Sequence, residues 1–274
     1  MSLSPSRIKE LEQLAFTARL RVLQMAAHGG CFVGAALSCV DILAYLYAEV
    51  LRVTPRTLDD SSRDYFLLSK GHAVPAQYAV LAELGFFEAS RLERHLSTED
   101  DVYWHPNRAV PGVEFQSGSL GHSLSVGIGI ALDARRAGDP CRVFVLLGDG
   151  ELNEGSIWEG LLVARAQALG NLVLIVDRNR LQANVETEAL VPLEPLSDKL
   201  RAFGALVSEV DGHSFEALAA ALAALPSAEQ RPIAIIANTV RGKGVPSLEG
   251  RTNAWFVHGS PALIEELNQN RGPA

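Results

Sequence analysis

The chain has 274 residues, 24 basic and 32 acidic side chains and a net charge of −8. This length suits one large domain or two small ones, and 48% hydrophobic with 20% charged residues is typical of a globular protein. The acidic balance argues against nucleic acid or an anionic membrane as partner. Cysteines without metal-type spacing, a polar N-terminus and apolar runs too short for a bilayer favour a cytoplasmic protein.

Apolar periodicity predicts alternating helices and strands. In the first half we expect helices over 6–27, 38–51, 74–84, 89–96 and 121–137, strands over 65–68 and 142–147, and a loop over 97–117. In the second half we expect helices over 152–169, 196–203, 214–224 and 261–268, strands over 171–176, 205–210 and 232–238, and a loop over 178–194. This alternation predicts an α/β fold with a parallel sheet covered by helices on both faces. No linker divides residues 1–274, so we expect a single domain.

One motif carries chemistry. Gly148-Asp149-Gly150 closes one apolar run, and Asn179 follows the next. The carboxyl ends of parallel strands meet at one edge of a sheet, where ligands bind. Carboxylate and amide oxygens suit Mg²⁺, and glycines let the backbone approach a diphosphate closely. A lone Gly-Asp-Gly is usually only a turn, but the spacing and the flanking strands favour a magnesium and diphosphate site.

The segment 148–154, with Asp177-Arg-Asn-Arg-Leu-Gln182, resembles the thiamine diphosphate motif of transketolases. Further blocks resemble the family in the same order, from about residue 15 to 262: Ser69–Ala73, His105-Pro106, Gly118–Gly121, Val210–His213, Arg241–Val245 and His258-Gly259. The resemblance implies a thiamine diphosphate-binding fold of the diphosphate-binding (PP) type. It also implies an enzyme that transfers a two-carbon ketol unit from a ketose to an aldehyde through a covalent adduct with the cofactor.

The resemblance assigns roles to individual residues. The magnesium ligands would be Asp149, Asn179 and the main-chain carbonyl of Leu181. The cofactor would also contact His72, Gly118, Leu120, Gly148, Gly150 and His258. Glu154 matches a buried carboxylate that links two active sites across a dimer, although a helix N-terminal acid is the alternative.

The catalytic candidates are three histidines. His72, His105 and His258 match family histidines near the diphosphate and the substrate, where imidazole can move protons and steady a developing alkoxide. We expect His95 to be a surface helix residue, and the turn after Val210 does not favour substrate contact by His213.

The chain departs from the family pattern around the substrate. Phe32 falls where the family has a histidine, and His28, four residues earlier, could replace it only by local rearrangement. Trp104 replaces a glycine, His122-Ser123 replaces glutamine-glycine, and Arg178 replaces an asparagine. The magnesium set is intact while the substrate set is altered, so we expect a less polar substrate surface and a non-standard donor or acceptor.

The resemblance implies that the pyrimidine-binding and C-terminal domains lie outside this chain. We expect a partner subunit that carries the pyrimidine-binding domain and the glutamate that activates the cofactor, in an α2β2 assembly. The chain alone should show no turnover. The substrate would be a small sugar or oxo compound.

Two alternatives stay open. A subunit of a 2-oxo acid dehydrogenase or a decarboxylating acyloin synthase shares the Gly-Asp-Gly and asparagine motif, but lacks the blocks at 69–73 and 241–245. Phe32 keeps a pyruvate-type donor in consideration. A non-catalytic structural or regulatory partner is the second alternative, and the intact set of Asp149 and Asn179 argues against it.

Overall fold

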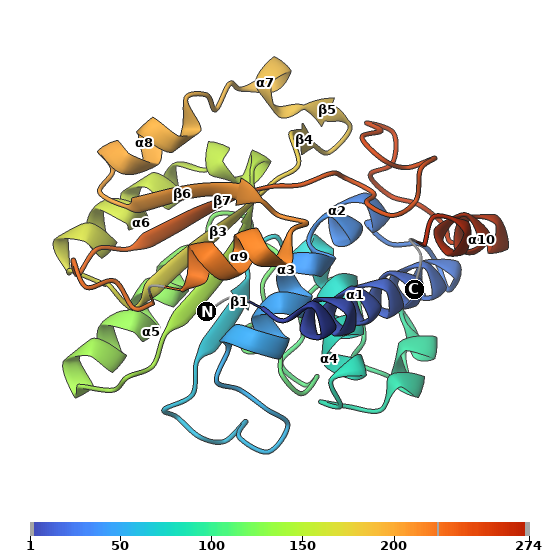
Figure 1. Ribbon diagram of the computed structural model, residues 1–274, viewed down its shortest axis with the longest axis horizontal. Helices are drawn as coiled ribbons and strands as arrows, with labels where there is room; N and C mark the ends of the chain where they lie inside the picture. Colours follow the sequence, from blue (N-terminus) through green and yellow to red (C-terminus); the bar gives the residue numbers. More distant parts are fainter. Residues whose placement is uncertain (1–2, 224, 272–274) are drawn as a thin grey trace.

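A five-stranded parallel sheet forms the centre of the molecule (Figure 1). The structure, a computed structural model, describes residues 3–223 and 225–271. The strands follow the order β1-β2-β3-β7-β6, with bounds β1 Tyr65–Leu68, β2 Val143–Gly148, β3 Leu172–Arg178, β6 Leu206–Asp211 and β7 Ile233–Asn238. The predicted α/β class and parallel sheet are confirmed.

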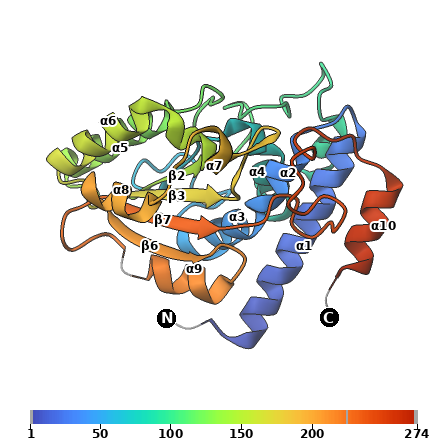
Figure 2. The same cartoon turned by 90° about the horizontal axis from the view of Figure 1, so that it is seen from above.

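Helices cover both faces of this sheet (Figure 2). One face carries α1 Pro5–Ala27, α2 Val33–Ser38, α3 Val40–Tyr45, α4 Val74–Glu83 and α9 Phe215–Leu222. The other carries α5 Ser123–Ala137, α6 Gly155–Ala166 and α8 Leu196–Ala202, while α10 Pro261–Gln269 packs on α1. Alternate residues of β2 enter the two cores: Phe144 and Leu146 face the first, Val143 and Val145 the second. Burial of both faces explains why the strands read as continuous apolar runs.

Most predicted elements lie within about two residues of the observed ones, but four segments differ. The helix predicted over 38–51 begins earlier, is interrupted at Cys39 and ends in a π-helical turn, η1 Leu46–Val50. The 152–169 helix starts only at Gly155, after the 3₁₀ turn η4 Gly150–Asn153, and 89–96 contains the 3₁₀ helix η3 Ala89–Arg94. The predicted loop 178–194 contains β4 Leu181–Gln182, β5 Val185–Glu186 and α7 Thr187–Leu190. The last residue of the helix predicted over 214–224 lies outside the described residues.

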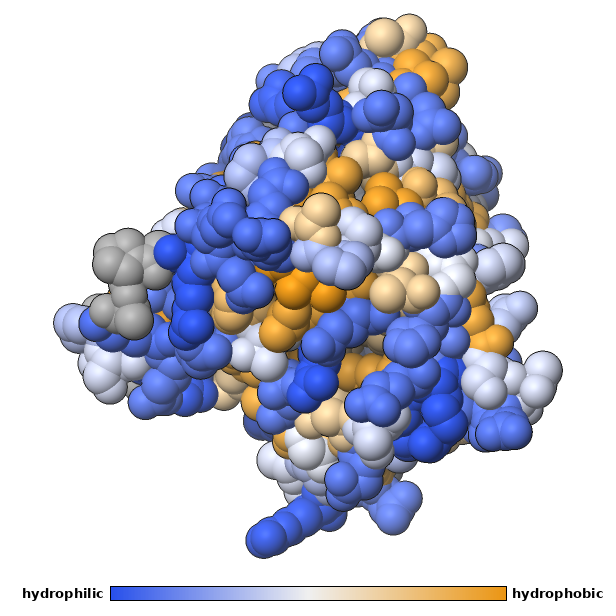
Figure 3. All heavy atoms as spheres, turned by 90° about the vertical axis from the view of Figure 1, so that its right-hand side faces the viewer, coloured by the Kyte–Doolittle hydropathy of each residue, from blue (hydrophilic) through white to orange (hydrophobic). Residues whose placement is uncertain are grey.

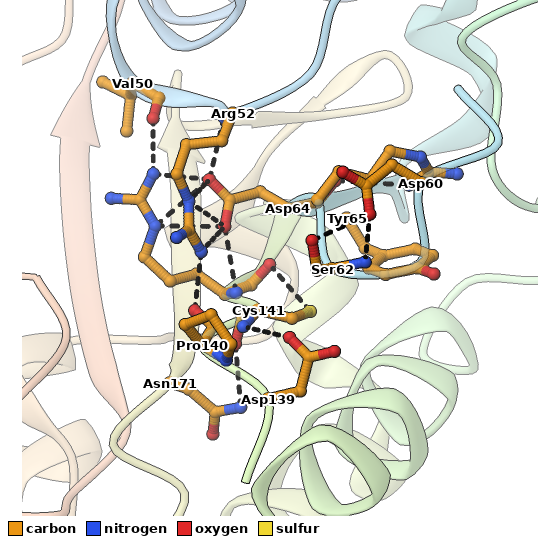
Figure 4. Close-up of polar contacts among 12 residues, drawn as sticks. Val50, Arg52, Asp60, Ser62, Asp64, Tyr65, Asp139, Pro140, Cys141 and Asn171 are labelled. Carbon is orange, nitrogen blue, oxygen red and sulfur yellow. Dashed lines mark hydrogen bonds and ion pairs between the residues drawn. The ribbon is translucent and has the colours of Figure 1, made fainter. Parts of the chain in front are cut away.

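A buried carboxylate fastens the amino ends of β1 and β2 (Figure 4). The Asp64 side chain accepts hydrogen bonds from the guanidinium of Arg52 at 2.8 Å and from the backbone N–H of Arg142 at 3.0 Å. The Arg142 guanidinium also binds it, and Arg52 reaches the carbonyl of Pro140 at 2.6 Å. This cluster joins the segment before β1 to the start of β2, at the edge opposite to the predicted site.

Two further features concern the cysteines and the helices. Cys31, Cys39 and Cys141 carry free, buried thiols. Burial raises the pKa of Cys31 to about 12, so this thiol stays protonated. Within the residues described, no helix combines the length and the apolar character needed to cross a membrane.

Candidate active site

The carboxyl ends of β2 and β3 bring the predicted metal ligands together. Gly148 pairs with Asp177 in the parallel register, so Asp149 and Asn179 leave the sheet on adjacent strands. Asp149 Oδ2 accepts the N–H of Arg180 at 2.6 Å, and Asn179 Oδ1 accepts the N–H of Leu181 at 3.0 Å. Both side-chain oxygens therefore contact the backbone of one turn, residues 177–181, which we call the metal turn after its predicted ligands. A carboxylate and an amide oxygen on one turn suit a Mg²⁺ ion that shares its shell with a diphosphate. The Leu181 carbonyl, the third predicted ligand, accepts a hydrogen bond from Nη2 of Arg241 at 2.9 Å.

The electrostatics of Asp149 also fit a cation. Its side chain is almost fully buried, and burial together with the charge of Asp177 raises its pKa to about 6, against the opposing effect of Arg178. A divalent ion would stabilise the ionised form. Among the described residues no group of three or more His, Cys, Asp and Glu side chains could hold a metal ion, so a site here depends on the amide and main-chain oxygens as well.

Arg178, one of the departures from the family pattern, touches a predicted metal ligand directly. Its Nη1 lies 3.1 Å from Asp149 Oδ2, and its Nη2 contacts Glu188 at 2.6 Å and Glu194 at 3.0 Å. The guanidinium is buried, whereas both glutamates reach solvent. Arg178 thereby ties the segment around α7 to the metal turn.

A buried ion pair lies beneath this turn. Lys70 and Asp177 form a salt bridge, and both side chains are buried. Asp177 also accepts hydrogen bonds from the hydroxyl groups of Ser38, at 2.6 Å, and Thr239. The amide nitrogen of Asn179 donates to the same carboxylate at 3.2 Å, which leaves Oδ1 of Asn179 for the metal turn. Lys70 and Asp177 belong to two motifs that lie far apart in the sequence, and no sequence pattern indicates that they pair. This ion pair was therefore not predicted.

Two glycines of the predicted site, Gly150 and Gly118, lie close against neighbouring side chains. A Cβ at Gly150 would lie 2.7 Å from the side chain of Gln182. Gly118 has a φ of +154°, and a Cβ there would lie 3.0 Å from the ring of His105. At both positions a neighbouring protein side chain lies too close for a Cβ, so the local packing requires glycine. Leu120, also predicted to contact the cofactor, is partly exposed on the same turn.

Two acidic residues of the motif have different surroundings. Glu151 is buried and accepts the N–H groups of Gly121 at 2.9 Å and Gly148 at 3.0 Å, and the hydroxyl of Ser69. This residue was not among the predicted ones. Glu154 is exposed in the single chain and begins α6 without a side-chain capping bond to any described residue. Its place at the N-terminus of α6 fits the alternative of an acid that interacts with the helix dipole, and the interface function of Glu154 stays a prediction.

The structure brings His72 and His105 to one side of the site. His72 is partly buried; burial and then the positive charge of Lys70 lower its pKa to about 3, so its imidazole is neutral. Burial also lowers the pKa of His105, whose ring lies against Gly118. His258 is exposed, with its ring centre 5.6 Å from that of Phe256.

The remaining histidines lie elsewhere. His28 is exposed at the end of α1 beside Arg21 and Leu92, so it does not replace the missing family histidine. His122 is exposed at the start of α5. His213 donates to Asp41 at 2.7 Å and accepts the N–H of Val240 at 2.9 Å, which makes it a structural residue.

The prediction for His95 was wrong. It is 2% exposed, and its Nδ1 lies 3.3 Å from the carbonyl of Met25. After the 3₁₀ helix η3 the chain turns beneath the end of α1, which buries the His95 ring. The apolar periodicity of the sequence did not indicate this turn.

The rings of Phe32 and Trp255 lie beside His72, and those of Phe256 and Trp104 continue from Phe32; we call these four side chains the aromatic wall. The ring centre of Phe32 lies 5.7 Å from His72, 5.0 Å from Trp255 and 5.4 Å from Phe256. Trp104 stands 6.3 Å from Phe256, and both rings are more than one third exposed. Figure 3, seen from the side that carries α2, β5 and α10, shows hydrophobic surface in the hollowed middle of this side, between hydrophilic margins. Two aromatic rings thus lie beside His72, and contact of this surface with a substrate stays a prediction.

Comparisons with known proteins show the family to which the chain belongs. Residues 12–272 match the family described as "Transketolase, thiamine diphosphate binding domain". The chain is 38% identical to one of the subunits of the apulose-4-phosphate transketolase of Phocaeicola vulgatus, over 84% of this chain and 81% of that protein. It is 34% identical to the 6-deoxy-6-sulfo-D-fructose transketolase subunit SqwG of Clostridium sp. (strain MSTE9), over 91% of each chain.

The fold is also similar to that of solved transketolases. The enzyme from Leishmania mexicana superposes with a TM-score of 0.87 at 26% identity, over 94% of this chain. The chain spans only 41% of that longer protein. The family match covers nearly the whole chain and includes every residue of the site. This chain belongs to the family of the thiamine diphosphate-binding domain of transketolases.

Proposed function

We propose that the chain is the cofactor-holding subunit of a transketolase-like enzyme that moves a two-carbon ketol unit from a ketose to an aldehyde. The observation that carries this proposal is that the side-chain oxygens of Asp149 and Asn179 meet on one turn, which also carries the Leu181 carbonyl. These oxygens would hold Mg²⁺, and the backbone at Gly150 and Gly118 would admit the cofactor. Thiamine diphosphate supplies, when bound, a carbon nucleophile that makes and breaks carbon–carbon bonds.

The histidines would handle protons and orientation. The neutral ring of His72 can accept a proton at one nitrogen and donate from the other, beside the diphosphate site. His105, also with a lowered pKa, would hold a substrate hydroxyl or carbonyl oxygen from the side of Gly118. His258, on the exposed rim, would donate to an anionic oxygen.

A partner subunit would complete the enzyme. Two relatives of this chain are named as transketolase subunits, which supports a second chain with the pyrimidine-binding domain and the activating glutamate. Exposed Glu154 begins α6, where Leu162 and Val163 are 56% and 48% exposed, and such apolar surface suits a subunit interface. We propose an α2β2 assembly in the cytoplasm, and the free thiols are compatible with a reducing compartment.

The substrate would be a non-standard sugar or oxo compound. The relatives' names refer to apulose-4-phosphate and 6-deoxy-6-sulfo-D-fructose, which supports specialised donors or acceptors in this family. Phe32 beside His72 favours a second candidate, a 2-oxo acid that loses carbon dioxide. Carbon dioxide release during turnover of the complex separates the two: ketol transfer from a ketose releases none.

Cofactor binding tests the proposal. In the co-purified complex, Asp149→Ala together with Asn179→Ala should weaken thiamine diphosphate binding in the presence of Mg²⁺ by at least about 100-fold, measured by calorimetric titration. Asp59→Ala, at an exposed position, is the matched control. Full affinity in the double variant would refute the proposed site. Ketol transfer by the isolated chain would refute the need for a partner.

A further inference from the structure

Three of the four residues of the aromatic wall stand on two segments that are joined to each other. Cys31 and Val257 form an antiparallel bridge, with hydrogen bonds of 3.1 and 3.0 Å between their backbones. A Cβ at Gly30 would lie 2.5 Å from the ring of Phe256, and one at Gly34 would lie 2.4 Å from the carbonyl of Ala254. The turn that carries Phe32 and the segment that carries Trp255 and Phe256 are thus packed backbone against backbone. Such a surface is preorganised, so a ligand need not order it.

The wall offers few polar groups. Phe32 and Phe256 have none, and Trp255 has only its indole N–H. The Arg241 guanidinium lies 5.2 Å from the Trp255 ring, but it donates to the carbonyl oxygens of Leu181, at 2.9 Å, and Ala183. Its charge is committed to the metal turn. A substrate hydroxyl placed against Phe32 would lose water without gaining a partner, which disfavours a polyol at this position.

The open end of the wall suits an aromatic ring. Trp104 and Phe256 are 37% and 38% exposed and stand nearly perpendicular, with an interplanar angle of 89°. An incoming aryl group can stack on one ring and meet the edge of the other, the arrangements that aromatic pairs prefer. His72, whose ring centre is 4.7 Å from Trp255, supplies the polar edge for the reacting carbonyl.

We propose that the aromatic wall makes the enzyme select an aryl aldehyde as acceptor over a short hydroxylated aldehyde. The inference rests on the proposed ketol transfer and deepens it. The donor ketose loses its C2–C3 bond and leaves as an aldehyde. A new bond forms between the two-carbon unit and the aldehyde carbon of the acceptor, and the former aldehyde oxygen takes a proton. No oxidant or reductant is required.

The test compares benzaldehyde with glycolaldehyde as acceptors for the purified complex, with one ketose donor. The wild type should have the higher kcat/KM for benzaldehyde. Phe32→His should lower the benzaldehyde to glycolaldehyde ratio about tenfold, mainly through KM, whereas Phe32→Leu, which keeps an apolar side chain, should lower it less. A wild-type preference for glycolaldehyde, or an unchanged ratio in Phe32→His, overturns the inference but leaves the proposed ketol transfer standing.

A second measurement does not depend on turnover. Trp104 and Trp255 are two of the three tryptophans, so in a Trp158→Phe background the intrinsic fluorescence reports on the wall. Benzyl alcohol, an unreactive analogue, should bind about tenfold more tightly to the Trp158→Phe variant than to the Trp158→Phe, Phe32→His double variant. Glycerol should bind to both variants with equal affinity. Equal binding of benzyl alcohol to both overturns the inference. Failure of the proposed function would instead appear as absent cofactor binding.

Discussion

Removal of the buried carboxylate of Asp177 should damage both stability and cofactor binding. In Asp177→Asn, Lys70 stays buried with the carbonyl of Ala35, at 2.9 Å, as its chief acceptor. Breaking a buried ion pair by removing one partner costs about 3–5 kcal/mol. We expect the upper end of this range, because Ser38 and Thr239 also donate to this carboxylate and an amide cannot accept from all of them.

Lys70→Met should cost less, about 3 kcal/mol, because Asp177 keeps its hydroxyl donors. The pKa of Asp177 is lowered and that of Lys70 raised despite the burial of both, so the two groups stabilise each other's charged form. The double variant should therefore lose at least about 2 kcal/mol less than the sum of the single losses. Since the carboxylate also orients the amide of Asn179, Asp177→Asn should weaken Mg²⁺-dependent cofactor binding about 10–100-fold.

Urea unfolding followed by tryptophan fluorescence, without metal or cofactor, measures the free energy of unfolding of each variant. Calorimetric titration of the folded variants measures their Mg²⁺-dependent affinity for the cofactor. Asp59→Asn, at an exposed position, controls for the change of residue type and should cost under about 0.5 kcal/mol. Additive losses in the double variant, or a loss below about 1 kcal/mol in Asp177→Asn, would refute the reasoning.

Three further predictions concern other charged groups. Asp64→Asn should cost about 3 kcal/mol in urea unfolding at pH 7, whereas Asp59→Asn, nearby but exposed, should cost under about 0.5 kcal/mol. Burial tends to raise the pKa of Asp64, but the guanidinium groups of Arg142 and Arg52 (Figure 4) lower it below its usual value. The stability that ionised Asp64 contributes is therefore complete above pH ~4 and is lost as the pH falls through the folded pKa. Asp64→Asn should not show this pH dependence. Arg178→Asn should raise Mg²⁺ affinity at pH 8 about tenfold, since it removes a competing cation from Asp149; a weaker affinity would contradict this. In the wild type, Mg²⁺ affinity should fall as pH drops below about 6, the pKa of Asp149, and a flat titration profile would contradict this.

The sheet and the juxtaposition of Asp149 with Asn179 could be predicted because each follows from a local pattern. Strands buried on both faces are continuous apolar runs, and the two predicted ligands come directly after two of them. Glu151 was missed because the 3₁₀ turn η4 breaks the helical phase, so the sequence does not reveal which acid of the motif is buried. Trp255 and Phe256 lie in an irregular segment that no sequence pattern marks. Only their tertiary contacts with Phe32 show that they belong to the aromatic wall.

The two parts of the site depend on different parts of the fold, and this explains how one can change while the other is kept. The metal turn is anchored by β2 and β3, where Asp149 and Asn179 are fixed by backbone register and buried hydrogen bonds. Replacement there would leave polar groups buried without partners. The aromatic wall stands on surface segments that pack on each other, so a histidine can become Phe32 without disturbing the sheet. We therefore expect substrate preference to diverge more readily than cofactor binding.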